Sequence, residues 1–233
     1  MGVVLPGCDI KIGALKIAIV EDHLMFREIV RKVCAEDHDF EVVAEAGGGF
    51  EAIECIVRSK PDVVVLDLVL PDLDGFAVLD RVRHLGQYPR VLAISSYCGP
   101  YVIFRLEEAR VQGFVDKRSQ TLGSLRMALD ALRSNRSFFS ETFLKMKSEF
   151  RHDPLAFNKL LTKQQMTVLS LVAQQYDDAA IAKHLSIGER TVETHRTLIM
   201  RKLEIHSRME LVHFANLRGF IPCWSFESYK RET

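Results

Sequence analysis

The sequence lacks a long apolar run. Nothing in its 233 residues approaches the about 20 consecutive apolar residues that a membrane-spanning helix needs. The first residues also lack the basic start and the continuous apolar segment of a signal peptide. We therefore expect a cytoplasmic protein with no membrane partner, in which residues 1–15 form an extension before the first strand.

The sequence also lacks a regular spacing of its five cysteines. They are scattered and never spaced C-x-x-C, which argues against a disulfide framework and against a structural zinc site. The net charge is zero but unevenly spread: residues 14–136 carry 16 basic and 19 acidic side chains, whereas residues 155–221 carry 9 and 6. This asymmetry favours two units, the second of them with an anionic partner.

Residues 16–133 alternate short β-rich runs with amphipathic helical patterns. The apolar runs are nearly continuous, as in parallel strands that helices cover on both faces. Five repeats of strand and helix predict an α/β domain with a doubly wound, five-stranded parallel sheet. We expect its strands at 16–20, 41–46, 63–67, 91–95 and 113–117.

Polar side chains stand at the carboxyl ends of these strands, which meet at one rim of a doubly wound sheet. Glu21, Asp22 and Asp67 form an oxygen-rich set suited to Mg²⁺. Ser95 and Lys117, at the ends of two further strands, can hold the remaining charge of a phosphoryl group. An aspartate beside a metal can also act as a nucleophile and form an acyl phosphate.

Four motifs carry a resemblance to the receiver domains of response regulators: "VEDH" (20–23), "VLDLVLPDLDG" (65–75), "LAISS" (92–96) and "GFVDK" (113–117). The resemblance implies a flavodoxin-like fold in which Asp67 accepts a phosphoryl group from a sensor histidine kinase. It also implies the roles of the surrounding residues, which are Mg²⁺ ligation by Asp22, Asp67 and the carbonyl of Leu68, a water-mediated metal contact by Glu21, phosphoryl contacts by Ser95 and Lys117, and an aromatic switch at Phe114.

Two residues depart from the usual receiver pattern. Glu21 stands where Asp is common, and Arg118 follows the lysine where many receivers have proline. Neither change removes a required group, so we expect phosphorylation. The alternative is a receiver that works without phosphorylation, as a binding or dimerising module.

The two aspartates further along the motif allow other readings. "DLDG" (72–75) resembles the start of haloacid-dehalogenase-type phosphatases, which need the first Asp at a strand end; Pro71 disfavours a strand running into Asp72. An EF-hand loop lacks a ligand, because Arg81 stands at its glutamate position. We expect Asp74 to cap the next helix and Asp72 to be a solvated loop residue.

The strand–helix rhythm stops after residue 133. We predict a linker at 134–158, with one short helix whose aromatic residues pack on a neighbouring domain. Residues 159–221 read as a small all-α, four-helix domain containing a helix-turn-helix, and 222–233 as a tail. The stretch from "LTKQQ" to "HSR" (161–208) resembles the LuxR/FixJ helix-turn-helix. Together the two resemblances imply a NarL/FixJ-type response regulator, a phosphorylation-controlled transcription regulator rather than an enzyme.

The segment 189–203 is the expected recognition helix. Val192, Ile199 and Leu203 share the face that packs on the preceding helices, so the opposite face can enter the major groove of DNA. Arginine and lysine there would bind phosphates, and short polar side chains would read base edges. The predicted DNA-binding residues are Arg190, Thr191, Glu193, Thr194, Arg196, Thr197, Arg201 and Lys202.

Departures in this second domain concern mainly the DNA sequence that it reads. Glu193 stands where relatives often carry Lys, and its carboxylate repels phosphate unless it accepts from a cytosine amine. Gln175 stands where the family often has Gly, which suits a left-handed helix end. The resemblance further implies a homodimer on DNA. We expect its contact on the helix at 207–217, through Met209, Leu211, Val212 and Phe214.

Overall fold

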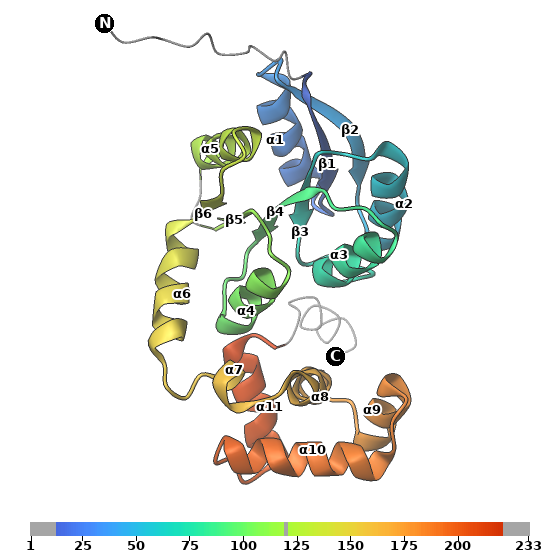
Figure 1. Cartoon of the computed structure of the whole chain (residues 1–233), viewed down its shortest axis with the longest axis vertical. Helices are drawn as coiled ribbons and strands as arrows, with labels where there is room; N and C mark the ends of the chain where they lie inside the picture. Colours follow the sequence, from blue (N-terminus) through green and yellow to red (C-terminus); the bar gives the residue numbers. More distant parts are fainter. Residues whose placement is uncertain (1–12, 119–120, 221–233) are drawn as a thin grey trace, which may run out of the picture.

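The computed structural model describes residues 13–118 and 121–220. Most of the predicted extension at 1–15, and the predicted tail at 222–233, lie outside these described residues. Figure 1 shows an α/β domain at one end of the molecule, a helical domain at the other, and helix α6 (Glu141–His152) along one side. Within the described residues, no helix combines the length and the apolar character that crossing a membrane requires.

The α/β domain is built on a parallel sheet with the strand order β2-β1-β3-β4-β5-β6. All five predicted strands are present and the doubly wound arrangement is confirmed. A sixth strand, which the sequence did not predict, adds two residues at the edge beside β5. The strands are β1 (Leu15–Val20), β2 (Phe40–Ala46), β3 (Val63–Asp67), β4 (Arg90–Ser95), β5 (Gly113–Asp116) and β6 (Phe138–Phe139).

Helices cover both faces of the sheet and form two cores with it. Helices α1 (Leu24–Ala35) and α5 (Leu122–Arg133) cover one face, and α2 (Gly49–Ser59), α3 (Gly75–His84) and α4 (Pro100–Glu108) cover the other (Figure 1). Successive side chains of a strand point to opposite faces of the sheet, so each strand contributes to both cores. Ile17 and Ile19 of β1 belong to the α1/α5 core, whereas Ala18 and Val20 belong to the opposite core.

The loop after β3 is shaped by two aspartates that cap two different helices. Asp74 Oδ1 accepts hydrogen bonds from the backbone N–H groups of Phe76 and Ala77, which confirms its predicted role as the N-cap of α3. Asp72 is exposed in the loop, as predicted, but it has a structural role that the sequence did not reveal. Its carboxylate accepts from the N–H groups of Gly49 and Phe50, so it caps α2 from 23 residues away.

Aromatic residues anchor α6 at both of its ends. Near its start, Phe143 packs on Phe114 of β5, at 5.5 Å between ring centroids, and stacks on Phe139 at 4.6 Å. Near its end, Phe150 packs on Phe157 of the helical domain at 5.1 Å. The segment predicted as a linker therefore contains a 12-residue helix that connects the two cores.

The helical domain contains the four predicted helices, which are α8 (Lys163–Ala173), α9 (Asp178–Leu185), α10 (Glu189–Lys202) and α11 (Arg208–Arg218), preceded by the single turn α7 (Phe157–Leu160). Gln175, just past α8, adopts the left-handed φ of 65° that the comparison with Gly predicted. Leu211 of α11 is completely buried in this domain, so its predicted place in an exposed dimer contact was wrong. Met209, on the same helix, is 82% exposed.

The two domains meet through an aromatic contact on α4. Tyr101 stacks on Phe220, with 4.1 Å between the ring centroids, and Phe104 packs edge-on against Phe157 at 5.8 Å. At the edge of this contact, Lys163 Nζ of α8 lies 2.6 Å from Glu108 Oε1. The helical domain therefore covers the side of α4 that carries Tyr101 and Phe104, while Val102, Ile103 and Leu106 face the core of the α/β domain.

Candidate functional site

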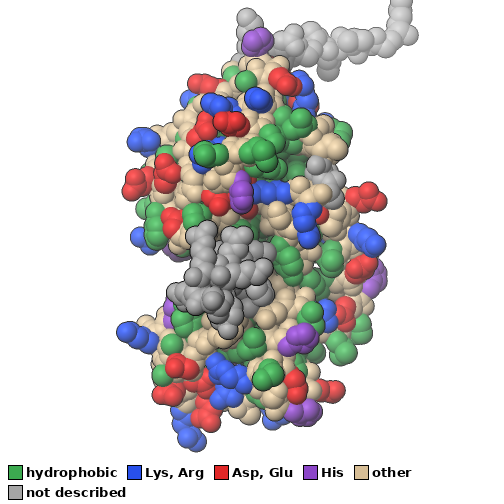
Figure 2. All heavy atoms as spheres, turned by 180° about the vertical axis from the view of Figure 1, so that it is seen from behind, with side chains coloured by type: hydrophobic (Ala, Val, Ile, Leu, Met, Phe, Trp, Pro, Cys, Tyr) green, Lys and Arg blue, Asp and Glu red, His purple; other side chains and the backbone are tan. Residues whose placement is uncertain are grey.

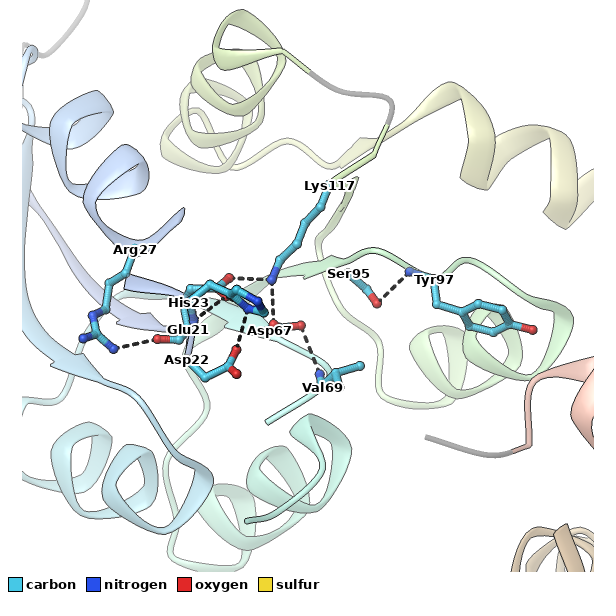
Figure 3. Close-up of polar contacts among 9 residues, drawn as sticks. All are labelled: Glu21, Asp22, His23, Arg27, Asp67, Val69, Ser95, Tyr97 and Lys117. Carbon is cyan, nitrogen blue, oxygen red and sulfur yellow. Dashed lines mark hydrogen bonds and ion pairs between the residues drawn. The ribbon is translucent and has the colours of Figure 1, made fainter. Parts of the chain in front are cut away.

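The predicted acidic and basic groups of the α/β domain converge at the carboxyl rim of the sheet. Figure 3 shows Glu21, after β1, and Asp67, the last residue of β3, on either side of the Lys117 ammonium. Lys117 follows β5 and extends back across the rim. The reversal of strand order between β1 and β3 places these groups at the switch point, where doubly wound sheets bind their ligands.

Lys117 contacts two buried carboxylates at once. Its Nζ lies 2.6 Å from Glu21 Oε2 and 2.6 Å from Asp67 Oδ2. The other oxygen of Asp67, Oδ1, accepts a hydrogen bond of 3.0 Å from the N–H of Val69. Glu21 is fully buried and Asp67 nearly so, while the Lys117 side chain is 11% exposed. Both carboxylates are therefore fixed in orientation, at hydrogen-bonding distance from one cation.

Burial sets the ionisation of this group. Burial and, next, the charge of Asp67 raise the pKa of Glu21 from 4.5 to about 7, although Lys117 acts in the opposite direction. Burial also raises the pKa of Asp67, again against the effect of Lys117. One ammonium does not balance the carboxylates of Glu21, Asp22 and Asp67. A divalent cation would supply the missing charge.

The residues at the rim fit a hard divalent cation. Asp22 is partly exposed, and single ligand atoms of Glu21, Asp22 and His23 lie within 4.8 Å of one another. Carboxylate oxygens around an open space are what Mg²⁺ binds in proteins. Asp22, Asp67 and Lys117 line a cleft of about 470 Å³. The predicted metal ligands Asp22 and Asp67 are thus brought together at this cleft.

Leu68, the third predicted metal ligand, is not brought to the cleft. Its side chain is buried in the core, and its carbonyl accepts a hydrogen bond of 3.1 Å from the N–H of Gly75. The next residue, Val69, lines the cleft and donates its N–H to Asp67. A backbone ligand for a metal is therefore better placed at Val69 than at Leu68.

Ser95 and Phe114, the other predicted residues of this site, have different surroundings. The Ser95 side chain lies at the cleft, and its Oγ accepts a hydrogen bond of 3.1 Å from the N–H of Tyr97. Phe114 is completely buried against Phe143 of α6 and does not line the cleft. A switch at Phe114 would act on α6 rather than on the opening of the cleft.

The predicted DNA-binding residues divide into two groups. The exposed face of α10 carries Arg190, Thr191, Glu193, Thr194, Thr197 and Arg201. Helix α10 lies at the end of the molecule farthest from the sheet, so this face is not covered by the α/β domain (Figure 1). On the face seen in Figure 2, basic and acidic side chains are interspersed over both domains, without a large basic field.

Arg196 and Lys202, also predicted to contact DNA, bind other residues of the helical domain, although Lys202 remains exposed. Arg196 forms a bidentate ion pair with Asp178 of α9, at 2.8 Å for the shorter contact. Arg208 reaches the same carboxylate at 3.1 Å, so Asp178 joins α9, α10 and α11. Lys202 Nζ donates to the carbonyl of Leu160 at 2.8 Å and to the side chain of Gln165 at 3.0 Å.

Sequence reasoning missed the structural roles of Asp178 and Tyr97. Asp178 meets Arg196 and Arg208 only through helix packing, which leaves no pattern in the sequence. The same holds for Tyr97. Its ring lies between the α/β and the helical domain, and contacts between domains leave no periodic pattern in a sequence.

Comparisons with known proteins match both domains. The family model of the response regulator receiver domain matches residues 17–129, and that of the bacterial regulatory proteins of the luxR family matches residues 159–215. A putative transcriptional regulator of Pseudomonas aeruginosa is 32% identical over 207 residues, which cover 88% of this chain and 99% of the relative. The response regulator protein VraR of Staphylococcus aureus is 28% identical, covering 86% and 96%.

Solved structures share the fold. RcsB from Salmonella enterica serovar Typhimurium, bound to the promoter P1flhDC in the presence of the phosphomimetic BeF3⁻, has a TM-score of 0.61 at 20% identity, covering 86% of this chain and 97% of RcsB. A structure of the RcsB response regulator–DNA complex has a TM-score of 0.59 at 21% identity and covers 88% and 98%. At this identity the likeness concerns the fold alone.

Proposed function

The chain belongs to the two-component response regulators of the NarL/FixJ type, with a receiver domain followed by a LuxR-type DNA-binding domain, and from this premise we propose that phosphorylation of Asp67 controls its binding to DNA. The phosphoryl donor is the phosphohistidine of a sensor histidine kinase. The observation that carries the proposal is Asp67 itself, a buried strand-end carboxylate held by Lys117 at the edge of an open cleft. The protein acts by binding rather than by turnover, in the cytoplasm.

The chemistry is a transfer between two protein side chains. An Asp67 oxygen attacks the phosphorus, the P–O bond forms, and the P–N bond to the kinase histidine breaks, leaving a neutral imidazole after protonation. Lys117, already 2.6 Å from Asp67, stabilises the negative oxygens of the phosphoryl group. The Ser95 hydroxyl donates to one of these oxygens after turning away from Tyr97. The product is an aspartyl phosphate.

Asp22 and Asp67 would hold Mg²⁺ with a backbone carbonyl, for which we now propose Val69 in place of Leu68, and with Glu21 acting through water. The ion supplies positive charge to the transferring phosphoryl group. Glu21 is fixed on Lys117 at 2.6 Å, so its carboxylate orients the lysine as well as facing the metal site.

DNA binding is proposed for the exposed face of α10. Arg190 and Arg201 would contact phosphates, while Thr194 and Thr197 would read base edges, and Glu193 would accept from a cytosine amine. We withdraw Arg196 from the contact set, because its guanidinium already binds Asp178. A homodimer on two-fold related half-sites is the arrangement that suits a small domain with one recognition helix.

The test of this function measures phosphorylation directly. Purified full-length protein is incubated with Mg²⁺ and acetyl phosphate, and its intact mass is recorded. We expect one added phosphoryl group in the wild type and none in Asp67→Asn. Asp72→Asn is the matched control, because it lies in the same loop and Asn retains one acceptor oxygen for the cap on α2. An adduct that persists in Asp67→Asn would assign the phosphoryl group to another residue.

The second candidate function is a phosphorylation-independent binding module. The observation in its favour is the closed contact of Lys117 with both Glu21 and Asp67, which already satisfies the lysine without a phosphoryl group. In that case the wild type would take up no phosphoryl group from acetyl phosphate. Its affinity for DNA would also be the same with and without the phosphodonor.

A further inference from the structure

Tyr97 touches both the phosphoacceptor cleft and the contact between the domains. Tyr97 lines the cleft together with Asp67 and Lys117. It also lines a second cavity, of about 100 Å³, between the receiver and the DNA-binding domain, together with Tyr101 and Phe220. Tyr97 is therefore a direct physical connection between the site of phosphorylation and the interdomain contact.

The backbone of Tyr97 is tied to the cleft through Ser95. The N–H of Tyr97 donates to Ser95 Oγ at 3.1 Å, and Ser95 is buried, so water does not compete for this hydrogen bond. Figure 3 shows the Ser95 hydroxyl directed toward Tyr97 and away from Asp67. Binding a phosphoryl group on Asp67 requires the hydroxyl to turn the other way, and the N–H of Tyr97 then loses its acceptor.

The ring of Tyr97 is enclosed by two glycines, one from each domain. A Cβ on Gly99, the N-cap residue of α4, would lie 2.5 Å from the Tyr97 hydroxyl. A Cβ on Gly219, just after α11, would lie 2.6 Å from Tyr97 Cε1. Only residues without a side chain allow both backbones to approach the ring this closely. Gly219 also has a φ of 81°, which favours glycine independently.

The segment after Gly219 continues directly into the interdomain contact. Phe220 is 1% exposed and stacks on Tyr101, in the first turn of α4, four residues after Tyr97. A movement of the Tyr97 ring thus acts on Gly219 and, through it, on the Phe220–Tyr101 stack. By contrast, Phe114 of β5 is buried against Phe143 of α6, and no aromatic contact among the described residues joins it to Phe220.

We propose that Tyr97 is the positioning residue that transmits phosphorylation of Asp67 to the DNA-binding domain. With Ser95 bound to the N–H of Tyr97, the ring stays between Gly99 and Gly219 and the domains remain in contact. When Ser95 turns to the phosphoryl group, the loop of Tyr97 is released and the ring leaves Gly219. The Phe220–Tyr101 stack then separates. The inference rests on the proposed role of Ser95 in phosphoryl binding.

Hydrogen exchange of the full-length protein, read out by mass spectrometry, tests this role. Without phosphodonor, we expect the amides of α4 and of residues 216–220 to exchange about tenfold faster in Tyr97→Ala than in the wild type. Acetyl phosphate with Mg²⁺ should raise exchange of the same amides in the wild type, with little further change in the variant. Tyr97→Phe, which keeps the ring, should behave like the wild type.

Two controls separate this role from a general loss of stability. The amides of β1 and β3 should exchange as slowly in Tyr97→Ala as in the wild type; if they do not, Tyr97→Leu replaces it, since Leu retains bulk in the receiver core. Tyr88→Ala truncates an exposed tyrosine elsewhere on the receiver and should change nothing at α4. Equal exchange of α4 in Tyr97→Ala or Tyr97→Leu and in the wild type, without phosphodonor, would overturn the proposal.

Intact mass of the same samples distinguishes this inference from the proposed function. A wild type that takes up no phosphoryl group contradicts phosphorylation at Asp67, whereas the comparison without phosphodonor still decides whether Tyr97 holds the domains together. A phosphorylated Tyr97→Ala that shows the full wild-type increase in exchange would refute the transmitting role alone.

Discussion

The receiver cleft holds its charged groups in buried contact, whereas the exposed face of α10 holds them in solvent. Glu21, Asp67 and Lys117 come from three strand ends, and Lys117 Nζ lies 2.6 Å from each of the two carboxylates. Arg190 and Arg201 lie on one helix without a comparable enclosure. Chemistry needs a preorganised, water-poor environment, while recognition of DNA needs side chains that can still reach outward. Changes to the two regions should therefore have different signatures.

The largest effect is expected from removing the buried cation of the cleft. Lys117→Met should slow phosphorylation of Asp67 by about a hundredfold, because the transferred oxygens lose their ammonium partner. The measurement is the rate of adduct formation by intact mass with acetyl phosphate. Arg118→Met is the control, since Arg118 is an exposed neighbour that points to Asp116 rather than to the cleft. If both variants slowed phosphorylation equally, the effect would come from the loss of one positive charge near the cleft and not from the buried Lys117–Asp67 contact.

The buried carboxylate of Glu21 should give the cleft a pH-dependent stability. Its pKa of about 7 in the folded protein lies above the ordinary 4.5, so ionisation destabilises the folded state as the pH rises between these values. Glu21→Gln removes this cost. In urea unfolding without Mg²⁺, we expect the variant to gain less than about 1 kcal/mol at pH 5 and about 3 kcal/mol at pH 8. A gain that is the same at both pH values would contradict the assigned pKa.

In the DNA-binding domain, substitution of one arginine of α10 should weaken DNA binding, and substitution of another should lower the stability of the fold. Arg190→Ala should weaken binding to duplex DNA about fivefold to tenfold and reduce the salt slope by about 1, because one phosphate contact is lost. Arg196→Ala should instead lower the free energy of unfolding by about 1–2 kcal/mol, because Asp178 loses its bidentate partner. Fluorescence anisotropy at several salt concentrations and urea unfolding provide the two measurements. If Arg196→Ala reduced the salt slope of DNA binding as much as Arg190→Ala does, Arg196 would count among the DNA-contacting residues.

The smallest effect is expected at the cap that Asp72 forms across the receiver. Asp72→Ala should lower the free energy of unfolding by about 1 kcal/mol, since the N–H groups of Gly49 and Phe50 lose their acceptor. Asp72→Asn retains an acceptor oxygen and should lose much less. Urea unfolding compares the two variants. If Asp72→Ala were as stable as the wild type, the cap on α2 would contribute nothing to stability.

The receiver could be predicted closely because its residues follow strong local patterns. Near-continuous apolar runs mark the buried strands, and parallel strands must bring their carboxyl ends together, so Asp67 and Lys117 could be paired at a separation of 50 residues. The two-residue strand β6 could not be predicted, since Phe138 and Phe139 have no periodicity to distinguish them from a loop. The cap that Asp72 forms could not be predicted, because its hydrogen-bond partners lie on another helix.

In the helical domain, the sequence did not reveal which charged side chains of α10 are paired within the domain. The 3.6-residue period predicted α10 and its exposed face, but it gave Arg196 and Arg201 the same role. Only the structure distinguishes them, because Asp178 and Arg196 are 18 residues apart and meet through helix packing. In the same way, Leu211 was taken for an exposed residue, since a helix with apolar residues on several sides does not indicate which side is covered.

Anchoring α6 at both ends limits how far the two domains can separate. Phe143 fixes its start in the receiver core and Phe150 fixes its end beside Phe157, with only a short segment, 153–156, between α6 and α7. A helix of 12 residues is about 18 Å long. A released DNA-binding domain therefore stays attached through a short, rigid helix instead of a flexible linker. Its effective concentration near α4 remains high. Reclosure after loss of the phosphoryl group should therefore be rapid, and the regulator can reset without a second signal.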